Sequence, residues 1–187
     1  LLYRYAAFLI LENRPSNKIN FLKKRFSKLN YKSLTSINLH SEEISKYSSI
    51  IAKKKKVRLI LKEYQKKFAK KFKRIAIEGR DISSKILNKD PRYDISFFFV
   101  CNLNTAAYRR WKDLKVINEQ ITLHEVKKSL KKRNELDVNR RFSPLIRAKD
   151  SITIRTDILN KKTMVDKMSK EIEKKLIKKY GRNLKAR

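Results

Sequence analysis

The segment Ile75-Ala76-Ile77-Glu78-Gly79-Arg80-Asp81 places a short apolar run directly before a glycine, a cation and an anion. We interpret residues 75–78 as a strand that delivers charged groups to the carboxyl edge of a sheet, where open α/β folds bind their ligands. A strand-to-loop turn with a surface Arg-Asp pair explains this segment equally well. The rest of the chain must therefore decide between the two interpretations.

Strands and helices alternate after this segment. Residues 94–100 include the nearly continuous apolar run Ile95-Ser96-Phe97-Phe98-Phe99-Val100, which is typical of a strand covered on both faces. A third strand is expected over residues 151–155. Helical patterns occupy residues 104–115, 123–138 and 163–179. This alternation predicts an α/β fold with a parallel sheet.

Two of these helices carry more detailed predictions. Thr122 and Glu125 have the spacing of a capping box at the start of the helix over 123–138. In the helix over 163–179, four apolar residues recur at helical spacing, and we expect them to form its buried stripe: Val165, Met168, Ile172 and Leu176.

The N-terminal part of the chain reads as mainly helical. Residues 1–13 are predicted to form a helix that stops before Pro15. Residues 16–41 are polar, basic and weakly patterned, and their pattern assigns no secondary structure. A long helical pattern begins at Ser41, and the run Lys53–Lys56 interrupts its apolar stripe, which leaves one helix or two.

Composition gives an ambiguous signal. The net charge of +32 is typical of a nucleic-acid-binding protein. However, the basic residues are spread along the chain beside 41% hydrophobic residues, so an AT-biased coding composition is our preferred explanation. The single cysteine, Cys101, rules out an internal disulfide and favours a reducing, cytoplasmic compartment. His40 and His124 lack the spacing of metal ligands.

Arginine is the residue type that points most clearly to a site. Its rigid guanidinium group binds phosphate or carboxylate through two parallel hydrogen bonds, which lysine cannot do. Several arginines follow the expected strands or lie on the expected helices: Arg4, Arg58, Arg80, Arg109, Arg110, Arg133 and Arg140. Each one alone is explained by a solvated surface position, and spacing does not show whether they converge.

Five collinear segments resemble bacterial cytidylate kinases. They are Leu2-Tyr3-Arg4, residues 42–52 with Val57-Arg58, residues 77–82, residues 109–114, and residues 133–140 with Ser143-Pro144-Leu145. The resemblance covers nearly the whole chain. The Gly-Arg-Asp loop together with the Arg-x-x-x-Asp-x-Asn-Arg segment is fairly specific to this family among nucleoside monophosphate kinases.

The resemblance implies a three-layer, parallel-sheet P-loop nucleoside monophosphate kinase fold. It implies transfer of the γ-phosphoryl group of ATP, with Mg²⁺, to CMP or dCMP. Residues 1–187 would form a single incomplete kinase domain. Within it, residues 16–70 resemble the CMP-binding insertion and its helices, residues 101–142 the lid, and residues 71–100 and 143–187 the core.

The resemblance assigns phosphate chemistry to five arginines. Arg4, Arg80 and Arg140 look like the cations that clamp the phosphate of CMP. Arg109 and Arg110 look like lid arginines with a catalytic role, which offset charge on the phosphoryl group during transfer.

It assigns recognition of the nucleoside to five other residues. Ser49, Arg58 and Asp81 look like the donor and acceptor groups that read the cytosine edge. Arg133 and Asp137 resemble a pair that contacts the sugar.

The chain also departs from the family pattern. Ser83-Ser84 stand where the family usually has Gly-Thr, Ala106 lacks a lid arginine, and Arg155 replaces an aspartate. Glycine occurs only at positions 79 and 181, so no Gly-x-x-x-x-Gly-Lys-Ser/Thr loop can be written in the sequence. We therefore expect a chain truncated before its first strand and phosphate loop, and inactive alone.

Two alternatives remain open. One is a basic nucleic-acid-binding protein, and the other is a kinase for a different nucleoside monophosphate. For the kinase we expect a monomer with no specific nucleic-acid partner. We also expect no membrane partner, because the apolar N-terminal segment over residues 1–11 is too short to span a bilayer.

Overall fold

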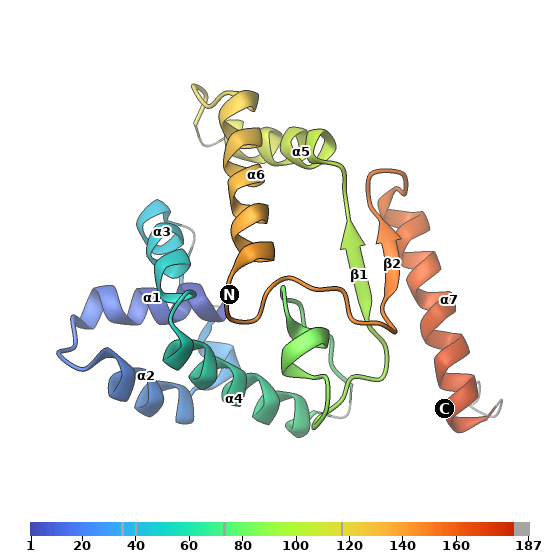
Figure 1. Cartoon of the computed structure of the whole chain (residues 1–187), viewed down its shortest axis with the longest axis horizontal. Coiled ribbons are helices and arrows are strands. Elements are labelled where there is room, and N and C mark those ends of the chain that lie inside the picture. The colour runs from blue at the N-terminus through green and yellow to red at the C-terminus, as the bar shows by residue number, and fades with distance from the viewer. Residues whose placement is uncertain (35, 40, 73, 117, 182–187) are drawn as a thin grey trace. The chain divides into compact units, whose positions relative to one another are not determined.

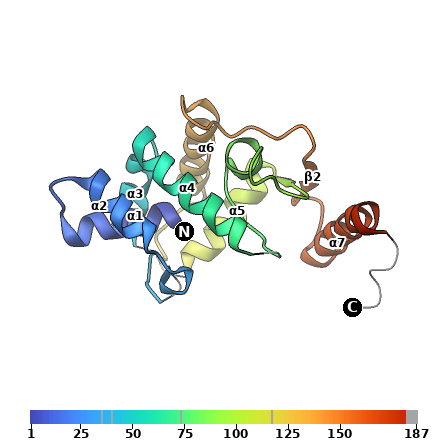
Figure 2. The ribbon, with the colours of Figure 1, turned by 90° about the horizontal axis from the view of Figure 1, so that it is seen from below.

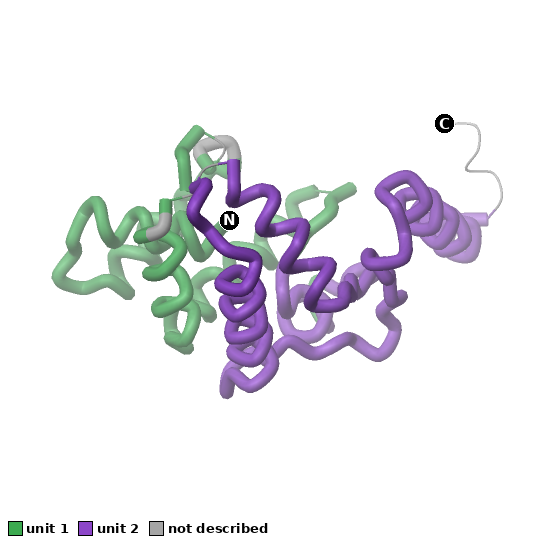
Figure 3. Tube along the Cα trace, turned by 90° about the horizontal axis from the view of Figure 1, so that it is seen from above, with its two compact units in different colours: residues 1–78, 89–91 green, residues 79–88, 92–187 purple. Residues whose placement is uncertain are grey.

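The computed structural model describes residues 1–34, 36–39, 41–72, 74–116 and 118–181. This part of the chain divides into two compact units, coloured separately in Figure 3. Unit 1 comprises residues 1–78 and 89–91. Unit 2 comprises residues 79–88 and the chain from residue 92 onward.

Unit 1 is helical in its described part. It contains α1 (Leu2–Asn13), α2 (Lys18–Ser27), the 3₁₀ turn η1 (Tyr31–Leu34), α3 (Glu42–Ile51) and α4 (Lys55–Lys71). Helix α1 packs against α3, and α2 packs against α4. Figures 1 and 2 show these helices gathered around α1.

The core of unit 1 lies between these helices. Ala6 and Ala7 of α1 are completely buried, and their small side chains allow neighbouring helices to approach closely. Leu22 of α2 and Leu61 of α4 are also completely buried. Each fully buried leucine adds roughly 1.5–3 kcal/mol of hydrophobic stabilisation, so this core is the main force holding unit 1 together.

The helix expected over residues 1–13 is confirmed as α1. Arg14 ends it in the left-handed conformation, with φ of 41°, and its N–H donates to the Ile10 carbonyl oxygen. The pattern from Ser41 onward forms two helices, α3 and α4. The Ser41 hydroxyl caps α3 by accepting a hydrogen bond from the Ile44 N–H at 3.2 Å.

The segment left unassigned over residues 16–41 contains α2 and η1. Asn17 starts α2, because its side-chain oxygen accepts from the Asn20 N–H at 3.1 Å. Leu22 and Phe26, four residues apart, bury one face of the helix.

Unit 2 contains a parallel pair of strands, β1 (Phe97–Val100) and β2 (Ile152–Arg155), paired from Phe97 with Ile152 to Val100 with Arg155. Figure 1 shows them side by side. Helices α5 (Leu103–Lys115) and α6 (Leu123–Asn139) follow β1 and precede β2 along the chain, and they pack against each other. The predicted α/β class with parallel strands is confirmed.

The predicted capping box is also present at the start of α6. The Glu125 carboxylate accepts from the Thr122 N–H at 2.9 Å, and the Thr122 hydroxyl accepts from the Glu125 N–H at 3.2 Å. Two backbone donors of the helix end are thereby satisfied, which fixes where α6 begins.

The strand predicted over residues 75–78 is wrong. These residues form neither helix nor strand, and Ile75 is 39% exposed. A strand needs a hydrogen-bonded neighbour, and among the described residues β1 and β2 pair only with each other.

The burial predicted for the last helix, α7 (Lys161–Tyr180), is wrong too. None of its described residues is buried, and Val165 is 49% exposed. In β1, Phe99 is 51% exposed, so this strand is not covered on both faces. The apolar spacing predicted the helix and the strand correctly, but burial also requires a partner surface.

Three serine hydroxyls connect the start of both strands to the turn η2 (Ile82–Ile86). The Ser96 and Ser151 hydroxyl oxygens are 2.7 Å apart, and those of Ser83 and Ser96 are 2.5 Å apart. Ser96 and Ser151 are buried. This hydrogen-bonded chain fixes η2, and with it the preceding Arg80-Asp81 segment, against the strands.

A second polar cluster lies on the surface of unit 2. The Asp150 carboxylate accepts hydrogen bonds from the Tyr93 hydroxyl and, at 3.0 Å, from Nη2 of Arg92.

Within the described ranges, no helix is long and apolar enough to cross a membrane.

Candidate functional site

Two arginines converge on Asp137 near the end of α6. Nε of Arg80 lies 3.4 Å from one carboxylate oxygen of Asp137, and Nη1 of Arg140 lies 3.1 Å from the other. The Arg140–Asp137 pair is one helical turn apart, whereas Arg80 comes from the distant segment before η2. The fold therefore joins the Gly-Arg-Asp segment to the end of α6 within unit 2.

The backbone that follows α6 holds this cluster in place. Nε of Arg140 donates to the Ser143 carbonyl oxygen, and Ser143 adopts a positive φ of 52°. The Leu145 N–H donates to the Asp137 carbonyl oxygen at 2.7 Å. Asp137 and Arg140 are each only 17% exposed, while Arg80 is 45% exposed and faces solvent.

The residues beside Arg80 are held by close packing. A Cβ atom added at Gly79 would lie 2.7 Å from Cγ1 of Ile82, so a larger residue would force that side chain to move. Asp81 is buried, with 7% exposure. A buried carboxylate directly after a solvent-facing arginine makes this turn more than a pair of surface charges, which favours the functional interpretation of the segment.

Unit 1 holds three of the predicted residues. Arg58 is buried in α4, where Nη1 donates to the Ala52 carbonyl oxygen at 3.2 Å and the guanidinium lies 5.4 Å from the centre of the Tyr3 ring. Nη1 of Arg4 donates to the Leu39 carbonyl oxygen at 3.4 Å. Ser49 is exposed on α3, and its hydroxyl donates to the Ser45 carbonyl oxygen at 3.2 Å.

The remaining predicted arginines lie on exposed helix faces of unit 2. Nη2 of Arg109 donates to the Thr156 carbonyl oxygen at 2.8 Å, directly after β2. Arg110 is exposed on α5, and Arg133 is exposed on α6 one turn before Asp137. The structure thus brings Arg80, Asp137 and Arg140 together and places Arg109 at the carboxyl end of β2.

A polar group at the carboxyl edge of the strands was not predicted from the sequence. Asp157 accepts from Arg155 at 3.0 Å and from the Asn102 amide at 3.3 Å. The hydrogen bond from Arg155 lowers the pKa of the Asp157 carboxyl group. Its other carboxylate oxygen is buried without a hydrogen-bond partner among the described residues. Position 155 departs from the family pattern, with arginine in place of an aspartate, and this departure was the feature of the sequence that could have pointed to the group.

The sequence contains no Gly-x-x-x-x-Gly-Lys-Ser/Thr loop of the kind that binds the phosphates of ATP. The two glycines of the sequence are too few for a phosphate-binding loop. Among the described residues, no group of three or more histidines, cysteines, aspartates or glutamates is placed to hold a metal ion.

Comparison with known proteins assigns the family. The cytidylate kinase family model matches residues 2–174. The chain belongs to the cytidylate kinase family. Family membership implies the α/β fold of P-loop nucleoside monophosphate kinases, which are phosphotransferases, and agrees with the parallel strands of unit 2.

Individual relatives agree with this assignment. A cytidylate kinase of Clostridium tetani (strain Massachusetts / E88) is 34% identical over 76% of the chain, and the match spans 59% of that protein. A cytidylate kinase of Mesomycoplasma hyopneumoniae (strain 7448) is 30% identical over 94% of the chain and 80% of its own length. A bifunctional pantoate ligase/cytidylate kinase of Prochlorococcus marinus (strain MIT 9312) is 38% identical over 70% of the chain and 25% of its own length.

Proposed function

We propose that this chain supplies the acceptor-nucleotide half of an enzyme that transfers the γ-phosphoryl group of ATP to CMP or dCMP. Membership of the cytidylate kinase family supports the reaction class. The observation that carries the proposal is the convergence of Arg80 and Arg140 on one carboxylate, because it brings together two cations that are far apart in sequence.

In this proposal the arginines act on phosphate groups. Arg80 and Arg140, together with Arg4, clamp the phosphate of the acceptor through charge-assisted hydrogen bonds. Arg109 and Arg110 offset the negative charge that spreads over the phosphoryl group during transfer. Such a reaction depends on positioning and electrostatic stabilisation, so it requires no nucleophilic side chain from the protein.

The nucleoside is recognised by a second group of residues. Ser49, Arg58 and Asp81 read the cytosine edge, and the burial of Arg58 and Asp81 supports this role because buried polar groups discriminate strongly against a mismatched base. Arg133 and Asp137, one turn apart on α6, contact the sugar.

We also propose that the ATP site needs a strand, a phosphate loop and a helix that the 187 residues do not contain. A further strand would give residues 75–78 the hydrogen-bonded neighbour that they lack among the described residues. The chain is then a single incomplete kinase domain, with residues 16–70 as the CMP-binding insertion, 101–142 as the lid, and 71–100 with 143–187 as the core.

The cellular setting follows from the same proposal. A kinase of free nucleotides needs no membrane partner, and the single cysteine suits a reducing compartment such as the cytoplasm. We propose that it acts there as a monomer.

CMP binding by the 187-residue chain tests the acceptor site. Titration calorimetry should show CMP binding that Arg140→Ala weakens roughly 10- to 100-fold, because a hydrogen bond to a charged group contributes about 1.5–3 kcal/mol. Arg141→Ala is the matched control, since Arg141 is the exposed neighbour in sequence and should leave binding unchanged. Unchanged CMP affinity in Arg140→Ala would contradict the phosphate clamp.

Two further titrations separate the alternatives. UMP and AMP should bind more weakly than CMP, and Asp81→Ala should reduce the difference. If AMP or UMP bound better, the residues assigned to the base would be wrong. A generic DNA duplex that bound tightly with a steep salt dependence, while CMP did not bind, would instead favour the nucleic-acid-binding alternative.

Catalysis is tested separately from binding. The chain alone should show no CMP-dependent ATP turnover, whereas the chain joined to an upstream strand–loop–helix with a Gly-x-x-x-x-Gly-Lys-Ser/Thr loop should show it. Turnover by the chain alone would contradict the missing ATP site.

A further inference from the structure

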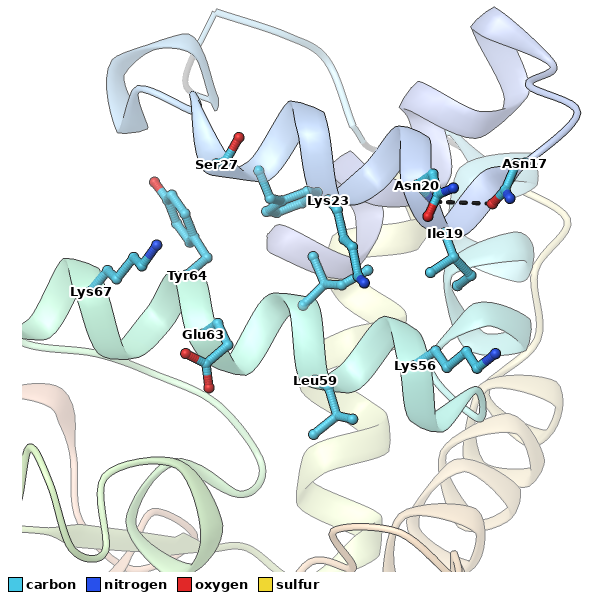
Figure 4. Close-up of a pocket in the computed structure, with 12 residues that line it drawn as sticks. Asn17, Ile19, Asn20, Lys23, Ser27, Lys56, Leu59, Glu63, Tyr64 and Lys67 are labelled. Carbon is cyan, nitrogen blue, oxygen red and sulfur yellow. Dashed lines mark hydrogen bonds between the residues drawn. The ribbon is translucent and has the colours of Figure 1, made fainter.

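A pocket of about 540 Å³ lies between α2 and α4 within unit 1 (Figure 4). Its walls are one face of each helix. Ile19, Lys23 and Phe26 of α2 recur at spacings of four and three, as residues on a single helical face do. The volume falls within the range of about 300–1,000 Å³ that is typical of small-molecule sites.

The floor of this pocket is apolar and partly aromatic. Phe26 and Ile60 are buried beneath it. The rings of Phe26 and Tyr64 pack edge to face, with centroids 5.7 Å apart. Leu59 at the border is 51% exposed. A flat apolar group bound in this pocket would therefore be shielded from water and would contact the aromatic rings of Phe26 and Tyr64.

The border of the pocket is cationic. Lys56 and Lys67 lie toward opposite ends of the lining face of α4, and Lys23 reaches between the two helices (Figure 4). Glu63 is the lining carboxylate, so three ammonium groups stand against one negative charge. The salt bridges seen for Lys70, Lys174 and Lys179 in the described part of the chain do not include the three lysines of the pocket.

We propose that the α2–α4 pocket binds a small organic anion with a flat apolar body. The floor takes the apolar body, and Lys23 with Lys67 takes the anionic group. Because the two surfaces are adjacent, a molecule that carries both features gains more than one that carries either alone. The pocket lies within residues 16–70, but its lining includes none of the individual side chains that we assign to the phosphate, base or sugar of CMP, so we propose it as a separate site.

Naphthalene-2-sulfonate is a suitable probe, and naphthalene-2-carboxamide is its neutral counterpart with the same ring system. Titration calorimetry with the 187-residue chain should show the sulfonate binding about tenfold more tightly than the carboxamide, which corresponds to about 1.4 kcal/mol. Lys23→Gln and Lys67→Gln should each remove most of this difference. Lys24→Gln is the matched control, because Lys24 is exposed on α2 but does not line the pocket.

Leu59→Asn tests the apolar half of the site without adding a charge, and the exposure of Leu59 means that the substitution should leave the fold intact. It should weaken the sulfonate and the carboxamide alike. Equal affinity of the two probes for the wild-type chain would overturn the proposal, as would unchanged sulfonate affinity in both Lys23→Gln and Lys67→Gln. Competitive displacement of the sulfonate by CMP would also overturn it, because the pocket would then not be a separate site.

Discussion

Tyr93 is the residue whose chemistry is changed most clearly by its neighbours. Burial and the hydrogen bond to Asp150 together raise the pKa of the Tyr93 hydroxyl group to about 12. The same hydrogen bond lowers the pKa of Asp150, with a further contribution from Arg92. The neutral phenol and the ionised carboxylate thus stabilise each other.

The pH dependence of Tyr93 follows from the direction of its shift. Because the folded-state pKa is above the unfolded value of about 10, its contribution to stability is complete below the unfolded pKa. That contribution is lost as the pH rises through the folded pKa. Absorbance titration of the phenols should show one group ionising near pH 12 in the wild-type chain and missing in Tyr93→Phe.

Asp150→Asn supplies the control for that assignment. It removes the negative charge that opposes ionisation while keeping a hydrogen-bond acceptor, so the pKa of Tyr93 should fall toward its usual range. A high-pH step that persisted unchanged in Tyr93→Phe would show that another tyrosine is responsible.

The predictions that succeeded at the level of single residues are local ones. Ser41 and the Thr122–Glu125 pair act within one helical turn, so sequence spacing alone defines their geometry. The pairing of Arg80 with Asp137 depends on contacts between distant segments. The sequence suggested that both residues matter, but only the fold shows that they meet.

Helix α6 is the element whose beginning is best determined by sequence. The capping box lowers the pKa of Glu125, mainly through the backbone hydrogen bond from Thr122. Stability from this carboxylate is therefore present above its unfolded pKa and is lost as the pH falls through its lower folded pKa.

Removal of the cap gives a measurable prediction. Thr122→Ala should lower the free energy of unfolding by about 1 kcal/mol, because the Glu125 N–H at the helix start loses its acceptor. Urea denaturation followed by circular dichroism measures the change. Thr105→Ala is a suitable control, since at that helix start the acceptor is the Asn102 side chain and the Thr105 backbone N–H is retained. Equal losses in both variants would contradict the assigned role of Thr122.

Elements differ in how much of their environment their own sequence determines. The spacing in α7 predicts a helix because helix formation is decided mainly within the segment. Burial of its stripe depends on a surface that another segment must supply, and Val165 remains exposed. Residues 75–78 failed as a strand for a related reason, because strand pairing is never a property of one segment. Helix α2 was not predicted, because the two residues that it buries, Leu22 and Phe26, are too few to give a clear helical pattern among its basic residues.

The charge of the whole molecule opposes its folding. Fifty lysines and arginines face eighteen aspartates and glutamates, so most basic side chains have no acidic partner to offset them. Self-repulsion of this kind is greatest in the compact state and is weakened by salt.

The chain should therefore become more stable as ionic strength rises. Between about 0.1 M and 1 M sodium chloride the screening length falls from about 10 Å to about 3 Å, and the thermal midpoint should increase across this range. Scanning calorimetry at several salt concentrations measures it. Sodium perchlorate and sodium chloride at equal ionic strength separate general screening from specific anion binding. A midpoint that fell with added chloride would mean that attractive ion pairs outweigh the repulsion.

The Asp137 carboxylate has a consequence for how any anion reaches Arg80 and Arg140. Both guanidinium groups already have a negatively charged partner, so in the proposed function an incoming phosphate competes with Asp137 for their N–H donors. The displaced carboxylate then needs hydrogen-bond donors of its own. Free phosphate brings only one hydroxyl in its dianionic form, whereas a molecule that carries further hydroxyl groups beside its phosphate supplies more donors. In the proposed function, recognition at this position is therefore an exchange of partners, and it favours ligands whose hydroxyl groups can bind the displaced carboxylate.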